Sequence, residues 1–168
     1  MFFSLVFTGL MMIYVLFEPL TIKEREFEDV PVFEINSFIM YELNEKGLKT
    51  LMTGDKTLKY EDRYTVDTID FTDQSKGFIS NMKADRGLYK EDIVNLNGDI
   101  RYVREDGLMF QSEAMTYNTT TAVANTTSSY TASKNKSTMT GTSLEYHSIP
   151  NTMKSKNIVI KYQLEDNS

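Results

Sequence analysis

The sequence predicts an all-β domain of many short antiparallel strands, a sandwich, jelly roll or barrel, behind one N-terminal transmembrane helix. Three observations carry this prediction. The first 17 residues are apolar and uncharged. The remainder shows period-two alternation of apolar side chains, which is typical of half-buried strands. Turn residues recur there about every 8–12 residues, as in all-β domains. We expect an anchor at 1–20, a linker at 21–31 and the β-domain at 32–168.

The uncharged block Met1–Phe17 would form a helix about 26 Å long, the short end of what spans a bilayer. A cleaved signal peptide is the alternative. It would need a basic start and a small-residue cleavage site, whereas Glu18-Pro19-Leu20 follows the block. We therefore favour an uncleaved single-pass anchor. Lys23 and Arg25 lie among acidic residues, so the flanking charges specify the orientation of the helix in the membrane only weakly. The body resembles an exported domain, and we therefore favour an N-terminus on the inner side of the membrane and the body outside.

Alternation is clearest between residues 33 and 43. One face of this strand is predicted to carry the apolar side chains Phe33, Ile35, Ile39, Tyr41 and Leu43. Further strands are expected at 48–53, 56–60, 64–71, 77–84, 92–96, 99–104, 108–117, 121–132, 137–146 and 156–164. We interpret the Thr-rich segment 118–142 as strands because β-branched residues suit a pleated surface.

Turn chemistry separates these strands. Glycine, Asn and Asp supply the positive φ angles that tight turns need. The clearest hairpin joins residues 100–102 to 108–110 across Glu105-Asp106-Gly107. Other turns are predicted at Asn44–Gly47, Gly54-Asp55, Asp73–Gly77, Asp85-Arg86-Gly87, Asn97-Gly98 and Pro150-Asn151.

The composition excludes several kinds of chemistry. With no Cys and one His, the chain has no disulfide scaffold, thiolate zinc site, cysteine nucleophile or multi-His metal centre. A net charge of −6 argues against a nucleic-acid binder. His147 adjoins a turn, and the carboxylate pairs flank turns, where we expect them to be solvated: Glu61-Asp62, Glu91-Asp92 and Glu105-Asp106. We expect no enzyme, no metal and no cofactor.

The last alternating segment, 156–164, is a candidate edge strand. Its apolar side chains are Ile158, Ile160, Tyr162 and Leu164. Proteins normally protect such edges, so a well-formed terminal strand indicates either internal pairing or pairing with a partner's strand.

The segment Ala84–Tyr89, the run Val94–Ile100, then Gly107, Phe110 and Ala114–Tyr117 resemble the LptC family. Members of that family are the bitopic inner-membrane component of the lipopolysaccharide transport machinery and have an OstA-like periplasmic domain. The resemblance extends over nearly the whole chain and rests on pattern more than on invariant residues.

The resemblance implies a twisted antiparallel β-jellyroll whose apolar interior shields lipid acyl chains. It implies a single-pass protein of the Gram-negative inner membrane, with the bulk of the chain in the periplasm. The lipid would come from an ATP-driven ABC transporter and pass to a periplasmic bridge protein through the C-terminal edge strand. The residues expected to line the interior, as lipid contacts or as a closed core, are Phe33, Ile35, Ile39, Tyr41, Ile69, Phe71, Phe78, Ile100, Tyr102, Phe110, Tyr130, Leu144 and Tyr146.

Three alternatives remain open from the sequence. The chain could be the soluble bridge protein itself, with a cleaved signal. It could be a pilin-like structural subunit, although such helices carry a Glu near their start and this one meets its first Glu at position 18. It could also be an extracellular carbohydrate-active enzyme, which would need a carboxylate pair in a cleft. An open apolar groove between strands would favour the transport interpretation.

Overall fold

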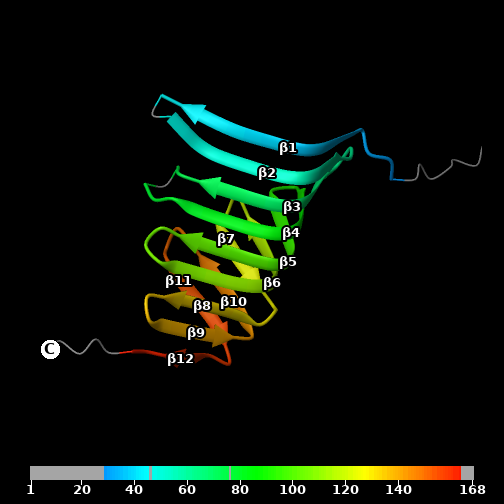
Figure 1. Ribbon diagram of the computed structural model, residues 1–168. Coiled ribbons are helices and arrows are strands. Elements are labelled where there is room, and N and C mark those ends of the chain that lie inside the picture. The colour runs from blue at the N-terminus through cyan, green and yellow to red at the C-terminus, as the bar shows by residue number, and fades with distance from the viewer. Residues whose placement is uncertain (1–28, 46, 76, 164–168) are drawn as a thin grey trace, which may run out of the picture. The chain divides into compact units, whose positions relative to one another are not determined.

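Twelve antiparallel strands form one sheet in the computed structural model, which describes residues 29–45, 47–75 and 77–163 (Figure 1). The chain divides into two units, Met1–Val30 and Pro31–Ser168, and the sheet belongs to the second. The strands are β1 Phe33–Asn44, β2 Gly47–Lys59, β3 Tyr64–Asp73, β4 Ser80–Lys90, β5 Ile93–Arg104, β6 Leu108–Asn118, β7 Val123–Thr126, β8 Tyr130–Lys134, β9 Ser137–Gly141, β10 Ser143–His147, β11 Thr152–Lys156 and β12 Val159–Lys161.

The predicted anchor at 1–20 lies outside the described residues, as does most of the linker. Within the part of the chain that the structure describes, no helix is long and apolar enough to span a membrane. The all-β prediction for the body is confirmed.

The first six strands pair in chain order, and then the pairing of β6 divides. Its first half, Leu108–Ser112, pairs with β8, and its last residues, Thr116–Asn118, pair with β7. From β8 the sheet continues through β9 to β12, and from β7 it continues through β10 to β11. In Figure 1, strands β7, β10 and β11 run at a steep angle to β8 and β9.

This division follows from a bend that crosses β1 to β6. At the bend Ser37, Thr68 and Asp99 have positive φ angles of 53°, 55° and 38°. The registers of β4 with β5 and of β5 with β6 shift at the same level. Such β-bulges kink a strand and increase its twist. Each long strand is therefore two shorter strands set at an angle.

The bend divides the sheet into two layers. The first layer consists of one half of each long strand, within residues 38–54, 69–84 and 100–112, together with β8, β9 and β12. The second layer comprises 33–36, 56–67, 86–97 and 114–118 with β7, β10 and β11. Tyr130 of the first layer hydrogen-bonds through its hydroxyl to Ser155 Oγ of the second, at 2.7 Å.

The hydrophobic core lies at the bend, where the layers are closest. Its buried residues Ile69, Ala84, Leu96 and Ile100 come from the middle strands β3, β4 and β5. Gly87 is packed so tightly that an added Cβ would collide with Ile69 Cδ1 and lie 3.4 Å from Leu96 Cδ2. Close approach of the layers therefore explains why small residues occupy the bend.

Three predicted turns are wrong for the same reason. Gly54-Asp55 lies inside β2, Asp85-Arg86-Gly87 inside β4 and Asn97-Gly98 inside β5. A bend within a strand requires positive φ angles or small side chains at close contacts. Gly98 has a φ of +79°, and Gly54 packs against the Phe38 ring. The predicted turns around Asp73–Gly77, Asp106-Gly107 and Pro150-Asn151 are confirmed.

The predicted C-terminal strands are each divided in two. The segment 121–132 contains β7 and the start of β8, and 137–146 contains β9 and most of β10. The predicted strand 156–164 is reduced to β12 after a break at Asn157, whose φ is +51°. At each break the chain passes from one layer to the other, which alternation alone does not indicate.

Candidate lipid-binding interior

One continuous apolar row follows the inner face of the first layer. Its residues pair in register across neighbouring strands, so their side chains share one face. From edge strand β1 to edge strand β12, this methionine row comprises Met40, Met52, Phe71, Met82, Tyr102, Phe110, Ala132, Met139 and Ile160. Phe71 and Met82 pack against the core, which identifies this face as the interior.

A second row follows the inner face of the second layer and is rich in tyrosine. This tyrosine row comprises Phe33, Lys59, Tyr64, Tyr89, Val94, Tyr117, Ala124, Tyr146 and Met153. Val94 packs against the core, so this row also faces the interior. The Tyr64 and Tyr89 rings lie 6.5 Å apart, centroid to centroid, with a tilt of 41°.

The interior is closed in the middle of the sheet and open at its edges. Leu96 and Ile100 at the bend are 2% and 0% exposed. Met40 on β1 is 56% exposed and Ile160 on β12 is 64% exposed, although both belong to the methionine row. An edge strand has no neighbour on one side, so the apolar face continues to the boundary of the domain and opens there.

The inner faces of the two layers carry several of the residues expected to contact lipid, and the contact itself stays a prediction. Phe33, Ile35 and Tyr146 face the interior from the second layer, as Phe71, Tyr102 and others do from the first. Ile69, Ile100 and Tyr130 are buried, and Phe110 stacks on Tyr130 with 5.7 Å between ring centroids. Leu144 pairs with Ser155, whose Oγ accepts the Tyr130 hydroxyl or donates to it. Phe78 lies outside the strands, under the Arg104 guanidinium at 5.0 Å.

The predicted face of β1 is wrong beyond residue 37. Ser37 takes a left-handed φ of 53°, so the alternation changes sides there. Ile39 is in register with Thr53 and, further along, with the Asp70–Lys83 ion pair of 2.7 Å on the outer face. Tyr41 shares this outer face, and the two side chains are 71% and 63% exposed. Phe38 and Met40 take their places inside.

Sequence reasoning missed most of the methionine row. Met40, Met52, Met82 and Met139 were not singled out, although together they contribute four of the ten methionines. The pattern that predicts their inward position is the alternation of apolar side chains, counted separately for the residues before and after the bend in each strand. Methionine suits a face that must fit irregular apolar shapes.

The C-terminal edge strand is present, in shortened form. Among the described residues β12 pairs with β9 alone, so its other side is unpaired. Ile158, Ile160 and Tyr162 are exposed there, at 43%, 64% and 73%. Leu164 lies outside the described residues. β1 is the edge strand at the opposite end of the sheet.

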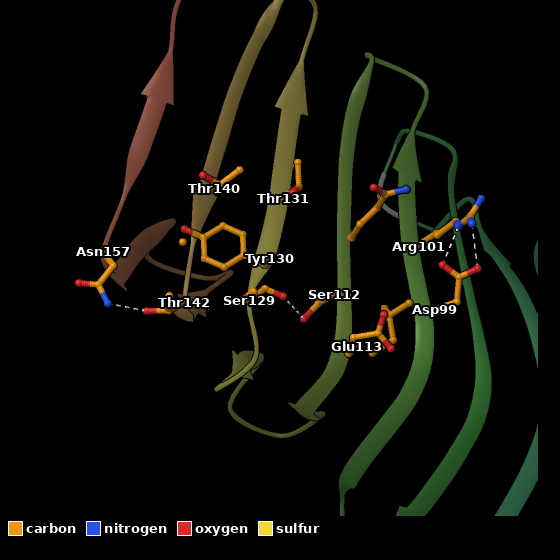
Figure 2. Close-up of a pocket in the computed structure, with 13 residues that line it drawn as sticks. Asp99, Arg101, Ser112, Glu113, Ser129, Tyr130, Thr131, Thr140, Thr142 and Asn157 are labelled. Carbon is orange, nitrogen blue, oxygen red and sulfur yellow. Dashed lines mark hydrogen bonds and ion pairs between the residues drawn. The ribbon is translucent and has the colours of Figure 1, made fainter.

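A shallow polar pocket of about 640 Å³ lies where β6 parts from β8 (Figure 2). Figure 2 shows the Asp99–Arg101 ion pair at one side and the Asn157–Thr142 hydrogen bond at the other. On its floor Ser112 donates to the carbonyl of Ser129 at 3.2 Å. These polar groups are ion-paired or hydrogen-bonded within the protein.

Charge on the inner face differs between its two ends. At the first-layer end Arg104 makes two hydrogen bonds of 2.7 Å to Asp106, which raise the pKa of Arg104. Lys134 also binds Asp106 at 2.7 Å, and both cations hold the pKa of this carboxyl well below its usual range. At the second-layer end, Lys59 Nζ lies 5.2 Å from the centre of the Tyr64 ring. No carboxylate among the described residues pairs with Lys59.

His147 has an ordinary structural environment. Its Nε2 lies 2.8 Å from Glu145 Oε1, which also accepts a hydrogen bond of 3.2 Å from Lys154. These two partners lower the pKa of Glu145, His147 contributing more. Within the described ranges, no group of three or more His, Asp or Glu side chains is placed to hold a metal ion.

The structure thus defines a class of protein: a bent antiparallel β-sheet in two layers, with an apolar interior that opens at the edge strands β1 and β12. Comparison with known families gives the particular one. The chain belongs to the lipopolysaccharide-assembly, LptC-related family, whose model matches residues 3–159. The family resemblance seen in the sequence is therefore confirmed. No curated protein matches the chain. The family gives the protein a role in lipopolysaccharide transport, as an inner-membrane-associated component in Gram-negative bacteria.

Proposed function

We propose that this protein carries lipopolysaccharide by shielding its acyl chains between the two layers. The methionine row supports this proposal most directly, because it offers apolar contact from β1 to β12 without interruption. A closed core would bury this row, whereas its outer members are more than half exposed. Lipid could therefore enter at one edge strand and leave at the other.

The proposal also includes the route by which the lipid reaches and leaves this protein. An ATP-driven ABC transporter of the inner membrane would deliver the lipid, and the segment 1–20 would anchor the chain as a single-pass protein beside it. A periplasmic bridge protein would receive the lipid. It would pair with the free side of β12, where an added strand extends the sheet by main-chain hydrogen bonds.

Site-specific photo-cross-linking tests lipid contact. We expect benzoylphenylalanine at Phe71, Tyr102 or Phe110 to capture lipopolysaccharide, because these side chains face the interior. Tyr41 is the matched control, since it is an aromatic residue on the outer face of the same sheet. Silent interior positions, or equal capture at Tyr41, would contradict the proposal.

Proline substitution tests the edge strand. Neighbouring residues of an edge strand direct their N–H groups to opposite sides, so one of Val159→Pro and Ile160→Pro removes an outward donor. The variant that keeps its thermal stability should lose cross-linking to the bridge protein. Ile160→Ala, which keeps the N–H, should retain it. Unchanged cross-linking in both proline variants would place the partner elsewhere.

A further inference from the structure

The two layers present different chemistry to the same interior. The methionine row offers thioether and aromatic contacts, which suit flexible hydrocarbon. The tyrosine row offers rings that end in hydroxyl groups, which suit a boundary between apolar and polar parts of a ligand. The difference runs along β3, β4 and β6, from Phe71, Met82 and Phe110 in the first layer to Tyr64, Tyr89 and Tyr117 in the second. Strand β5 is the exception, with Tyr102 in the methionine row and Val94 in the tyrosine row.

The cations of the interior differ in the same direction. Arg104, near the first-layer end, and its neighbour Lys134 share the one carboxylate of Asp106, so each has an acidic partner although the cluster keeps a net charge of +1. Lys59 belongs to the tyrosine row, is half-buried and rests against the Tyr64 ring. In the part of the chain described, no acidic side chain neutralises it. A half-buried ammonium without a counter-ion is suited to an anionic group of a ligand.

We propose that Lys59 and the surrounding tyrosine row bind the phosphorylated saccharide head group of a glycolipid, while the methionine row binds its acyl chains. This assignment rests on the proposed function, because it orients the ligand within the interior described there. Lys59 supplies a point charge and donors for a phosphate oxygen. Tyr64 and Tyr89 supply ring faces for the saccharide, and Tyr64 also supplies a hydroxyl donor. The Tyr89 hydroxyl donates to Asp92 Oδ1 at 3.3 Å, so it offers the saccharide an acceptor.

The test compares two probes that differ in phosphate alone. Since the chain contains no Trp, Phe110→Trp introduces a single reporter in the methionine row, and this variant is the parent. The full chain, held in amphipol, is titrated with bisphosphorylated lipid A and with its enzymatically dephosphorylated form. Adding Lys59→Ala should weaken binding of the bisphosphorylated probe about tenfold and leave the dephosphorylated probe unchanged.

Two further variants make the result specific. Lys56→Ala removes a neighbouring lysine that is paired with Glu34 at 2.9 Å on the outer face, and it should change neither titration. Arg104→Gln should not discriminate between the probes. An equal loss for both probes in Lys59→Ala would overturn the assignment, and so would a phosphate-selective loss in Arg104→Gln. If the parent binds neither probe, the proposed function itself fails, which is a separate result.

Cross-linking gives an independent measure of orientation. Benzoylphenylalanine at Tyr89 should yield adducts on the saccharide of lipid A, and at Phe71 adducts on an acyl chain, as mass spectrometry after de-acylation can show. The reverse pattern would overturn the assignment even if both positions capture the lipid.

Discussion

The bend and the edge strands carry similar apolar side chains and bury them very differently. Ile100 at the bend has no exposed surface, whereas Ile160 on β12 is 64% exposed. Both face the interior, so side-chain type does not explain the difference. Ile100 has strands on both sides and a second layer opposite, and Ile160 lies on a strand with a neighbour on one side alone among the described residues.

This comparison separates stability from access. A residue that is fully enclosed contributes burial and packing to the folded state, whereas an exposed edge residue contributes little until a partner covers it. In this sheet the bend holds the layers together. The edge residues Met40 and Ile160 remain exposed.

The largest expected effect is at the centre of the bend. Ile100→Ala should lower the free energy of unfolding by about 2–5 kcal/mol, because it leaves a cavity in a core that cannot collapse around it. Ile160→Ala should change it by less than about 0.5 kcal/mol. Urea unfolding of the full chain followed by circular dichroism measures both. Equal losses would show that stability is not concentrated at the bend.

Close packing at the bend gives the next effect. Gly87→Ala should cost about 1–3 kcal/mol, because its Cβ would collide with Ile69 Cδ1. Ile69→Val removes that carbon atom, so Gly87→Ala should cost clearly less in the Ile69→Val background. A double-mutant cycle measures this coupling. Additive effects would show that some other contact of Gly87 limits the site.

The bend also marks where the sequence stops predicting the structure. Glycine and Asn-Gly signals at 54, 87 and 98 predicted hairpin turns, and each lies within a strand. Turns and bulges both need positive φ or small side chains, so a local pattern does not distinguish them. What separates them is register with the neighbouring strands, which is a property of the assembled sheet.

The site was predicted to the same extent and failed at the same place. Strand existence, the inward positions of Phe71 on β3, Tyr102 on β5 and Phe110 on β6, and the C-terminal edge followed from alternation. The prediction of which β1 residues face the interior is wrong after Ser37, because one bulge exchanges the inward and outward residues in the rest of the strand. For the same reason the alternation places Tyr41 inside and Met40 outside, and the structure has them the other way round.

A smaller effect is expected where the two layers divide. The buried Ser112 hydroxyl donates to the Ser129 carbonyl at 3.2 Å and lies 3.2 Å from Thr126 Oγ1, so it contacts both branches of the sheet. Ser112→Ala should cost about 1 kcal/mol. Ser133→Ala, at an outer-face position of β8, is the control and should be neutral. A neutral Ser112→Ala would mean that other contacts suffice to join the branches.

The smallest effect concerns the hairpin between β5 and β6, and it depends on pH. Arg104 and Lys134 lower the pKa of Asp106 from its ordinary value of 3.8, so the ionised carboxylate favours the folded state. Because the pKa is lower in the folded protein, this stabilisation is complete above the unfolded value and is lost as the pH falls toward the folded one. The carboxylate is exposed, which keeps the effect small and sensitive to salt.

Asp106→Asn removes that dependence without changing the shape of the side chain. Its melting temperature should lie slightly below that of the parent at about pH 7, and the difference should shrink below about pH 4, where Asp106 of the unfolded chain takes up a proton. High salt should reduce the difference at neutral pH. If the difference in melting temperature stays constant down to about pH 2, it arises from turn geometry and not from charge, because Asp106 Oδ1 also accepts a hydrogen bond from the Leu108 N–H.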